Sequence, residues 1–421
     1  MKNKLAAIIL AAGKGERMKS ELPKVLHPVC GRPMLGYVLD LAREMKIRDL
    51  SVVLGYKADE VRKFLPPGTR TALQKKILGT ADAVKQALPA LSKFKGTVVV
   101  LYGDTPLLKK ETIEKFVERH RDCRAAATIM TAVMEDPSGY GRILRDKYGA
   151  ICGIAEDKDC DKYQKTIKEI NTGILCFDKD KLAQSIRLVK PGNAKKEYYL
   201  TDVIDILYKK GEPVETLEIS DANEALGINS RVELAAANKI MQGRINEAYM
   251  KEGISIVDPA TAFISYGTEI GADTVIYPFT VVEKNVKIGK LCSIGPFAHL
   301  RPGVVLEDNV SVGNFIEISR SKLSFKARAK HFGFIGDALI GRSVNIGAGT
   351  VTANYDGKNK NKTVIKDNAF IGSDSVLVAP VCIGKGAKTG AGSVVTSGRD
   401  VPDNSVVAGV PARQLKRQKE E

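Results

Sequence analysis

The first half of the chain alternates continuous apolar runs with stretches of helical spacing. Apolar runs rich in Val, Ile and Leu are typical of strands covered on both faces, and five occur, at Leu5–Leu10, Ser51–Leu54, Thr97–Tyr102, Ala126–Thr131 and Thr172–Phe177. Helical periodicity recurs between them, at Met34–Met45, Ala81–Leu91 and Glu111–Arg121. This alternation predicts an α/β fold with a doubly wound, mostly parallel sheet of the nucleotide-binding kind.

A long helix is predicted after this region. The stretch Asn229–Lys251 contains no proline and is dense in residues that favour helices. Gly253 follows it closely and is a typical helix terminator. We therefore expect a connecting helix over residues 229–253.

The second half has a period of six residues. Nine consecutive positions spaced by six are aliphatic: Ile270, Ile276, Val282, Ile288, Ile294, Leu300, Leu306, Val312 and Ile318. The phase is lost after Ile318, returns at Ile340 and returns again at Ile371. A period of six does not fit an α-helix, whereas it suits a solenoid in which each unit forms one short strand and one corner. The pattern predicts a left-handed parallel β-helix of hexapeptide repeats, with Thr352–Ala369 as an external loop.

These patterns divide the chain into four parts. We expect an α/β domain at 1–228, the connecting helix at 229–253, the β-helix at 254–411 and a basic, charged tail at 412–421. The net charge is +16, but the basic residues are spread along the chain without interleaved aromatic residues. This distribution argues against a nucleic-acid partner and is compatible with anionic small substrates.

Cysteine usage and the lack of long apolar runs indicate the compartment. The seven cysteines are scattered and form no C-x-x-C pair, which argues against a disulfide framework or a zinc site. No apolar run approaches the roughly 18 residues that span a membrane, and Leu5–Ala12 is better explained as a buried strand than as a signal segment. We expect a cytoplasmic protein without membrane insertion.

The first candidate motif follows the first predicted strand. It is Leu10-Ala-Ala-Gly-Lys-Gly-Glu-Arg-Met18, followed by Leu22-Pro-Lys24. Glycines at such a turn let backbone N–H groups approach phosphates, and Arg17 and Lys24 add positive charge. The P-loop pattern is absent, and the glycines alone are equally compatible with an ordinary strand–helix turn.

The second candidate motif is Tyr102-Gly-Asp104, at the end of a predicted strand. An aspartate at the carboxyl edge of a parallel sheet is well placed to hold Mg²⁺. In isolation, the same residue is as well explained as a loop cap.

Taken together, the motifs resemble those of the bifunctional N-acetylglucosamine-1-phosphate uridyltransferase/glucosamine-1-phosphate N-acetyltransferase family, which makes UDP-N-acetylglucosamine. Further matching motifs in the first half are Leu78-Gly-Thr80, Gly139-Tyr-Gly-Arg142, Glu156, Ile170-Asn-Thr-Gly173, Glu197-Tyr-Tyr-Leu-Thr-Asp202 and Gly227-Ile-Asn229. In the second half they are Leu300-Arg-Pro-Gly303, Gly313-Asn-Phe315, His331, Asn345-Ile-Gly-Ala-Gly349, Asn354-Tyr-Asp-Gly357 and Gly372-Ser373.

For the first half, the resemblance implies uridylyl transfer from UTP to N-acetylglucosamine 1-phosphate with Mg²⁺. Arg17 and Lys24 would be catalytic, and Asp104 and Asn229 would bind the metal. The uridine side would be held by Gly13, Gln74, Gly79 and Thr80, and the sugar by Gly141, Glu156 and Asn171. Further substrate contacts would come from Leu10, Ala11, Tyr102, Gly103 and Asn229.

For the second half, the resemblance implies a homotrimer that acetylates glucosamine 1-phosphate with acetyl-CoA. His331 would be the general base, a role that suits histidine as a residue type near neutral pH, and Tyr355 would stabilise the oxyanion. The acceptor would be held by Arg301, Lys360, Asn345 and Asn354. The acetyl-CoA groove would be lined by Ala348, Ser373 and Ala391.

Some positions depart from the family pattern. Ile77 stands where a glutamine is usual, and Ser319 where a lysine holds the sugar phosphate. Phe334 replaces a tyrosine, and Gly409 an arginine that touches the coenzyme. Arg320 adjoins Ser319, but neighbours on a strand point to opposite faces, which argues against its replacing the lysine.

Two alternatives to full bifunctionality stay open at this point. In one, the β-helix acts on a different amino-sugar 1-phosphate, or only weakly. In the other, the chain is a non-catalytic scaffold or regulatory subunit.

Overall fold

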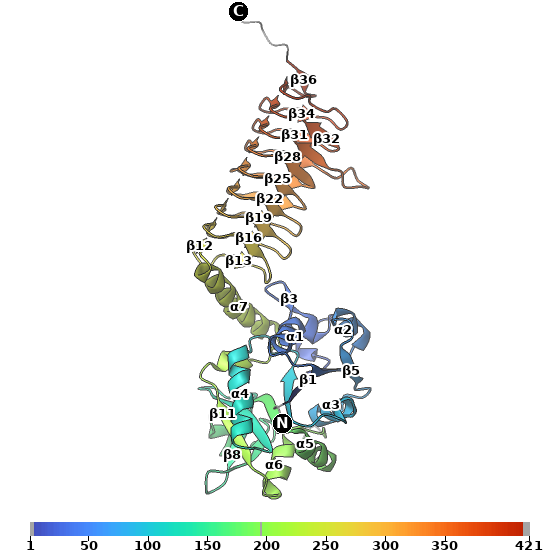
Figure 1. Cartoon of the computed structure of the whole chain (residues 1–421), viewed down its shortest axis with the longest axis vertical. Coiled ribbons are helices and arrows are strands. Elements are labelled where there is room, and N and C mark those ends of the chain that lie inside the picture. The colour runs from blue at the N-terminus through green and yellow to red at the C-terminus, as the bar shows by residue number, and fades with distance from the viewer. Residues whose placement is uncertain (1–3, 194–195, 416–421) are drawn as a thin grey trace, which may run out of the picture. The chain divides into compact units, whose positions relative to one another are not determined.

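The computed structural model describes residues 4–193 and 196–415. The chain divides into two compact units, and the boundary between them in the sequence lies between Asn238 and Lys239, within helix α7 (Arg231–Lys251). Figure 1 shows a sheet with helices in the N-terminal unit and stacked coils in the C-terminal unit.

The N-terminal unit is built on one mixed sheet. Its main path runs β11-β7-β10-β6-β1-β4-β5, and β8 and β9 branch from β10. These strands are β1 (Leu5–Ala11), β4 (Asp49–Leu54), β5 (Arg70–Leu73), β6 (Thr97–Tyr102), β7 (Ala127–Val133), β8 (Gly141–Arg145), β9 (Ile151–Ala155), β10 (Glu169–Asp178) and β11 (Val214–Glu218). Strand β1 is parallel to β4 and β6, and β10 is antiparallel to β6 and β7. The five predicted strands are confirmed, with small differences at their ends.

Helices cover both faces of this sheet, as the continuous apolar strands require. They are α1 (Met34–Glu44), α2 (Ala58–Phe64), α3 (Thr80–Ala87), α4 (Lys110–Asp122), α5 (Lys179–Ser185) and α6 (Asp202–Lys209). Successive residues of β1 enter two different cores: Ile8 packs into one cluster and Ile9 into the other. The helix predicted to reach Leu91 ends at Ala87, and a 3₁₀ turn containing Pro89 follows, because proline cannot continue the hydrogen-bonded ladder.

Short elements complete this unit. They are the hairpin of β2 (Pro28–Val29) and β3 (Arg32–Pro33), and the 3₁₀ turns Glu16–Met18, Lys24–Leu26, Leu88–Leu91, Gln164–Thr166, Ile186–Leu188 and Ala222–Ala225.

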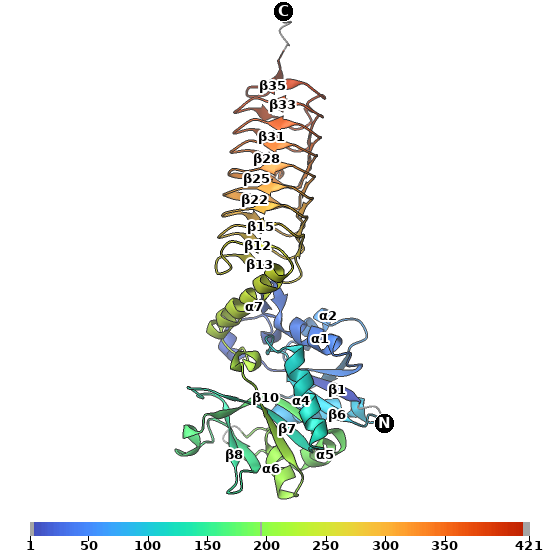
Figure 2. The same cartoon turned by 60° about the vertical axis from the view of Figure 1, so that its left-hand side comes forward.

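The C-terminal unit is the predicted left-handed parallel β-helix, with three sheets as its faces. The first face contains β12 (Ser255–Ile256), β15 (Val275–Ile276), β18 (Ser293–Ile294), β21 (Ser311–Val312), β24 (Arg328–Ala329), β27 (Asn345–Ile346), β30 (Phe370–Ile371), β33 (Lys388–Thr389), β35 (Val406–Ala408) and β36 (Arg413–Gln414). The second contains β13 (Phe263–Ile264), β16 (Val281–Val282), β19 (His299–Leu300), β22 (Ile316–Ser319), β25 (Gly333–Gly336), β28 (Val351–Ala353), β31 (Val376–Val378) and β34 (Val394–Val395). The third contains β14 (Glu269–Ile270), β17 (Lys287–Ile288), β20 (Val305–Leu306), β23 (Lys322–Leu323), β26 (Ala338–Ile340), β29 (Thr363–Ile365) and β32 (Val381–Ile383). Figure 2 shows these coils stacked in one column.

The aliphatic anchors of the repeat form the core of this unit. Ile276, Ile294 and Ile318, for example, are each less than 1% exposed, and parallel pairing aligns Ile276 with Ile294. The corners use left-handed backbone, as at Asp273 with a φ of 60° and Phe279 with a φ of 57°. The prediction of a solenoid with one short strand and one corner in each unit is confirmed.

The repeat shortens after Ile318 and does not stop. Leu323 follows Ile318 by five positions in place of six, and Ile340 follows Ile335 by the same spacing. The coils nevertheless stay in register, since Ile318 pairs with Ile335 and Leu323 with Ile340. Two successive corners are therefore one residue shorter than the regular corner.

The external loop is shorter than predicted. Thr352 is buried in β28, and β29 (Thr363–Ile365) pairs with both β26 and β32. The prediction of a loop over Thr352–Ala369 was wrong at both ends, because these flanking residues are packed in the solenoid. The loop that leaves the coils covers residues 354–362.

Close stacking predicts opposite effects for two Gly→Ala substitutions. A Cβ at Gly313 would lie 1.7 Å from the backbone oxygen of Lys330, whereas a Cβ at Gly243, inside α7, would meet no atom within 4 Å. We expect Gly313→Ala to lower the free energy of unfolding by about 1–3 kcal/mol through overpacking, and Gly243→Ala to raise it by up to about 1 kcal/mol. Thermal unfolding followed by circular dichroism measures both, and unchanged midpoints for Gly313→Ala would contradict the stacking.

Candidate active sites

The two motifs of the N-terminal unit meet at one edge of the sheet. Strands β1 and β6 are parallel neighbours, with Leu10 opposite Tyr102. The Gly103 N–H donates to the Leu10 carbonyl at 2.9 Å, which places the turn after β1 beside the turn after β6. Leu10 and Ala11 are buried, whereas Gly13 is exposed and has open space around it.

Lys24 lies between the two residues predicted to hold a metal. Its ammonium forms an ion pair with Asp104 and donates to Oδ1 of Asn229 at 2.7 Å. The Lys24 and Asp104 side chains are each only 13% exposed, so water screens this pair weakly. Gly15 makes room for the lysine, since a Cβ at this left-handed position would lie 2.6 Å from Cβ of Lys24.

The start of α7 fixes Asn229. Ser230 and Glu233 form a capping box: the Ser230 hydroxyl accepts from the Glu233 N–H at 3.2 Å, and a Glu233 carboxylate oxygen accepts from the Ser230 N–H at 2.9 Å. The Ile228 N–H donates to the Asp104 carbonyl at 3.0 Å. Asn229 is therefore held beside Asp104 although 125 residues separate them in the chain.

This donor set suits Mg²⁺ that is shared with a substrate. Asp104 and Asn229 direct two hard oxygens at the same cationic group, the Lys24 ammonium. Mg²⁺ usually takes one or two protein oxygens together with water and substrate phosphates. Among the described residues, no group of three or more His, Cys, Asp or Glu side chains could enclose a metal ion.

A second group of predicted residues lies at the start of α3. The buried Gln74 donates from Nε2 to the Gly79 carbonyl and to Asp82, both at 2.9 Å. The Thr80 hydroxyl accepts from the Leu200 N–H at 2.9 Å. A Cβ at Gly79 would lie 2.4 Å from the Tyr198 carbonyl oxygen, so the absence of a side chain at 79 allows this close packing.

The residues predicted to hold the sugar are also brought together. Asn171 on β10 pairs with Gly141 on β8, and a Cβ at Gly141 would lie 3.5 Å from the Glu156 carboxylate. The Thr201 hydroxyl donates to this carboxylate at 3.1 Å. Burial, followed by the charge of Glu156, raises the pKa of Asp202 to about 6.

Tyr102 and Arg17 have contrasting environments. Burial strongly raises the pKa of Tyr102, and the nearby carboxylates of Glu156 and Asp104 raise it further. The Tyr102 hydroxyl is therefore a neutral donor at working pH. Arg17 is exposed on the 3₁₀ turn Glu16–Met18.

In the β-helix, the predicted base and the predicted coenzyme residues form one column. His331, Ala348, Ser373 and Ala391 each stand two residues after a strand-end residue: Ala329, Ile346, Ile371 and Thr389. These strand-end residues are aligned by parallel pairing. The backbones stack closely, since the Asp374 N–H donates to the Ala348 carbonyl at 2.6 Å and the Gly392 N–H to Ser373 at 2.8 Å. His331 is exposed at the start of this column.

Three of the four predicted acceptor residues lie on another part of the coils, and Asn345 lies on the face of the column. Asn354 begins the loop of residues 354–362. Within this loop, Tyr355 and Lys360 form an isolated antiparallel β-bridge, and the exposed Tyr355 hydroxyl donates to the Gly357 carbonyl at 2.7 Å. Arg301 follows β19 and forms an ion pair with Glu317 at 2.8 Å. Asn345 is half-buried in β27.

Strand β25 separates His331 from part of the acceptor group. His331 precedes β25 (Gly333–Gly336), and Asp337, a partner of Asn354, follows it. Within the described part of the chain, no hydrogen bond or ion pair joins His331 to Arg301, Asn354 or Lys360. Asn345 precedes the column residue Ala348 on the first face, whereas Arg301 and Asn354 follow strands β19 and β28 of the second face.

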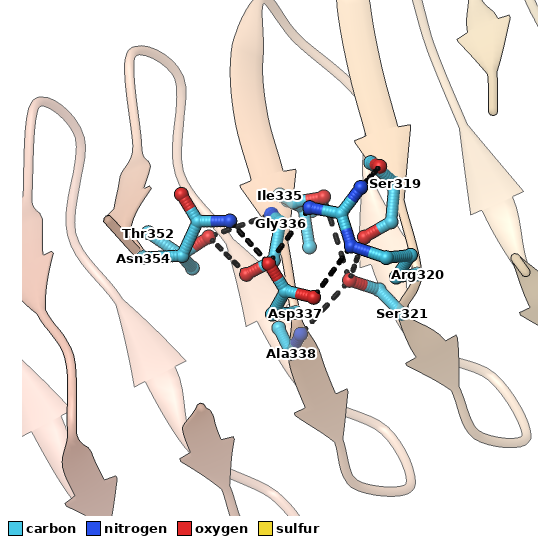
Figure 3. Close-up of polar contacts among 9 residues, drawn as sticks. All are labelled: Ser319, Arg320, Ser321, Ile335, Gly336, Asp337, Ala338, Thr352 and Asn354. Carbon is cyan, nitrogen blue, oxygen red and sulfur yellow. Dashed lines mark hydrogen bonds and ion pairs between the residues drawn. The ribbon is translucent and has the colours of Figure 1, made fainter. Parts of the chain in front are cut away.

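The expectation that Arg320 points away from Ser319 was wrong. Nη1 of Arg320 donates to Oγ of Ser319 at 2.8 Å (Figure 3). Arg320 lies one residue beyond β22 and has a left-handed backbone with a φ of 46°, so the alternation of an extended strand does not apply to it. Its guanidinium therefore covers Ser319, which is 1% exposed.

Sequence reasoning also missed Asp337. This residue holds both Arg320 and Asn354 (Figure 3). The available signal was the shortened spacing between Ile335 and Ile340, which places Asp337 at a corner that breaks the regular repeat. Of the other departures, Phe334 is half-buried in β25, and a Cβ at Gly336 would lie 2.7 Å from its ring. Ile77 is 48% exposed.

No helix in the described parts of the chain has both the length and the apolar character needed to cross a membrane.

Comparison with known proteins identifies both units. The MobA-like NTP transferase domain family matches residues 7–165, and the bacterial transferase hexapeptide family matches residues 267–300 and 362–397. A solved structure of a putative glucose-1-phosphate thymidylyltransferase from Bacillus anthracis covers 56% of this chain and 94% of its own, at 22% identity and a TM-score of 0.45.

Curated relatives match almost the whole chain. The bifunctional protein GlmU of Geobacillus sp. (strain WCH70) is 43% identical over 445 aligned positions, covering 98% of this chain and 96% of the relative. The bifunctional protein GlmU of Bacillus subtilis (strain 168) is 44% identical, covering 99% of this chain and 98% of the relative. Because both relatives are more than 40% identical and are matched over almost their whole length, the chain belongs to the GlmU family of bifunctional proteins.

Proposed function

We propose how the two activities of this bifunctional transferase, which makes UDP-N-acetylglucosamine, are divided over the chain. The N-terminal unit transfers a uridylyl group from UTP to N-acetylglucosamine 1-phosphate and releases pyrophosphate. The C-terminal unit transfers an acetyl group from acetyl-CoA to the amine of glucosamine 1-phosphate. The observation that carries the first assignment is the convergence of Lys24, Asp104 and Asn229 at one edge of the sheet.

Positioning and charge supply most of the catalysis in the N-terminal unit. Lys24 and the exposed Arg17 offset the negative charge that builds up as the sugar phosphate attacks the α-phosphate. Asp104 and Asn229 would hold Mg²⁺, which when bound supplies positive charge to the nucleotide phosphates. Leu10, Ala11, Gly13 and Gly103 line the same edge, beside the proposed uridine residues Gln74, Gly79 and Thr80. Tyr102, Gly141, Glu156 and Asn171 hold the sugar.

Acetyl transfer needs a base, an oxyanion partner and a place for the coenzyme. His331 accepts a proton from the attacking amine as the C–N bond forms, and Tyr355 stabilises the oxyanion. The C–S bond then breaks, and the coenzyme leaves as a thiol after taking up a proton. Arg301, Lys360, Asn345 and Asn354 hold the acceptor. The small side chains of Ala348, Ser373 and Ala391 leave space for acetyl-CoA along their column.

A homotrimer through the β-helix explains how separated groups can act together. At about 3.3 Å per residue, the four residues of β25 put roughly 13 Å between His331 and the corner at Asp337, which holds Asn354. A neighbouring copy can supply the missing group at a boundary between two β-helices. We place the enzyme in the cytoplasm because all seven cysteines are free thiols, as is usual in a reducing compartment.

The uridylyl site predicts a selective loss of activity. We expect Asp104→Ala to lower UDP-sugar formation by a factor of about 100 or more, because the carboxylate that would share Mg²⁺ with the substrate is removed. Acetyl transfer should stay within about twofold of wild type, since its proposed residues belong to the other unit. Product analysis with each substrate pair measures both rates, and a folded variant that lost both activities would contradict the assignment.

The Lys24 ion pair predicts competition between lysine and metal. The ammonium contacts the same two oxygens that would bind Mg²⁺, so Lys24→Met should tighten metal binding in the absence of nucleotide by about tenfold. Mn²⁺ titration followed by electron paramagnetic resonance measures the Kd without relying on activity. The matched control is Lys168→Met, which removes an exposed lysine paired with Glu135. Unchanged or weaker Mn²⁺ binding by Lys24→Met would show that these oxygens are not the metal ligands.

The proposed trimer predicts complementation between inactive variants. His331→Ala and Asn354→Ala should each lose most acetyl transfer when expressed alone. If each site combines His331 of one copy with Asn354 of its neighbour, random closed trimers of the two variants should regain about one quarter of the sites. Co-expression with two different affinity tags, followed by rate measurement, tests this. A monomeric mass by light scattering, or no recovery in verified mixed trimers, would rule out shared sites.

A further inference from the structure

We propose that Arg320 is a positioning residue of the acceptor site. Through Asp337, it fixes the amide of Asn354 so that the amide oxygen faces the sugar of glucosamine 1-phosphate. The inference rests on the proposed acetyl transfer by this unit. It adds Arg320 and Asp337 to the site and gives Asn354 a defined polarity. The three residues lie on successive coils (Figure 3).

Arg320 and Asp337 form a two-pronged ion pair. Nε of Arg320 donates to Oδ1 of Asp337 at 2.7 Å, and Nη2 donates to Oδ2 at 2.8 Å. Two parallel hydrogen bonds between a guanidinium and a carboxylate fix orientation as well as distance. Nη1 donates to Ser319 at 2.8 Å, so the guanidinium is held on two sides.

Asp337 transmits this order to Asn354. Its side chain is 14% exposed, and its carboxylate accepts a hydrogen bond from Nδ2 of Asn354. The hydrogen bond from Arg320 contributes most to holding the pKa of Asp337 below its usual range, so the group stays ionised. An ionised carboxylate only accepts hydrogen bonds, so the NH₂ end of the Asn354 amide must face it.

This arrangement leaves the amide oxygen of Asn354 available to the acceptor. Asn354 is 8% exposed, and turning its amide over would place Oδ1 against the Asp337 carboxylate. The oxygen therefore presents a fixed acceptor to a hydroxyl or amine of the sugar. Glucosamine 1-phosphate carries such donors, whereas its phosphate does not match an acceptor oxygen.

The local backbone explains why these side chains meet. Arg320 and Asp337 occupy the two shortened corners, with left-handed φ values of 46° and 50°. Pairing of Ser319 with Gly336 puts these corners on adjacent coils. Ser319 contributes by being small, because a longer side chain there would occupy the space of the Arg320 guanidinium.

The ion pair of Arg320 and Asp337 orients the Asn354 amide and does not supply a free positive charge for binding phosphate. The charges of Arg320 and Asp337 offset each other, and the guanidinium already uses three donor groups within the protein. Loss of Arg320 should therefore loosen the amide of Asn354 and weaken acceptor binding. Binding that is equal in the ground and transition states affects KM and leaves kcat nearly unchanged.

The test compares acceptor kinetics in single and double variants. We expect Arg320→Ala to raise the KM for glucosamine 1-phosphate about tenfold, with kcat within about twofold of wild type. Arg320→Lys keeps the charge but cannot form both hydrogen bonds, so its KM should be intermediate. In an Asn354→Ala background, Arg320→Ala should have no further effect, because the two residues act as one unit.

A matched control separates positioning from general loss of an ion pair. Lys287→Ala removes a pair with Glu269 at 2.8 Å on the same β-helix and should leave the acceptor KM unchanged. Additive effects of Arg320→Ala and Asn354→Ala on KM, or an unchanged KM in both Arg320 variants, would overturn the positioning role. Arg320→Lys keeps the test decisive if Arg320→Ala does not fold. A wild-type enzyme that makes UDP-sugar but shows no acetyl transfer would instead overturn the proposed function of this unit.

Discussion

Burial of one side chain, in most cases aliphatic, on each face of each coil holds the C-terminal unit together. A fully buried side chain of this size stabilises the fold by roughly 1.5–3 kcal/mol, and parallel pairing aligns each anchor with the anchors of the adjacent coils. Neither the coils nor the corners can shift independently, because a slip would move an anchor out of the core. Every functional position of this unit is therefore set by its distance along the chain from an anchor. His331 and Ala348 share a column for this reason: each follows a paired residue, Ala329 or Ile346, by two positions.

The same constraint explains why chemistry gathers where the repeat is irregular. A regular corner has a fixed length and a left-handed residue, as at Asp273 and Phe279. At Arg320 and Asp337 the corner loses one residue while the anchors on either side stay paired. The third coil in this series leaves the solenoid at Asn354. Three successive irregular corners thus place a cation, a carboxylate and an amide beside one another on a rigid base.

Sequence alone predicted the parts of the fold that depend on periodicity. Continuous apolar strands such as Thr97–Tyr102 and the anchors from Ile270 to Ile318 follow directly from burial. In the N-terminal site, parallel strands force Leu10 and Tyr102 to end together, so the meeting of the two motifs could be anticipated. The detailed position of Lys24 could not, because it depends on a capping box more than 200 residues later in the chain.

In the C-terminal site, the errors came from assuming regular geometry. The expected loop was too long because Thr352–Ala369 interrupts the six-residue repeat, although Thr352 and Thr363 within it are buried in strands. The alternation of side chains along a strand argued against Arg320 replacing the lysine expected at position 319. Arg320 instead lies just beyond β22 with a left-handed backbone. The break in spacing was visible in the sequence, but its effect on side-chain direction depends on which residue takes the left-handed conformation.

Ser319 and Arg320 show how a family position can change without leaving a gap. Resemblance places a lysine at 319, where this chain has a small, buried side chain. The guanidinium of the next residue fills that space and reaches Ser319 and Asp337 together. A lysine at 319 and this placement of Arg320 compete for the same volume, so the two positions are coupled. Transfer of residue roles by alignment treats each position separately. Because Ser319 and Arg320 pack closely at this corner, the two positions have to be compared with the family together.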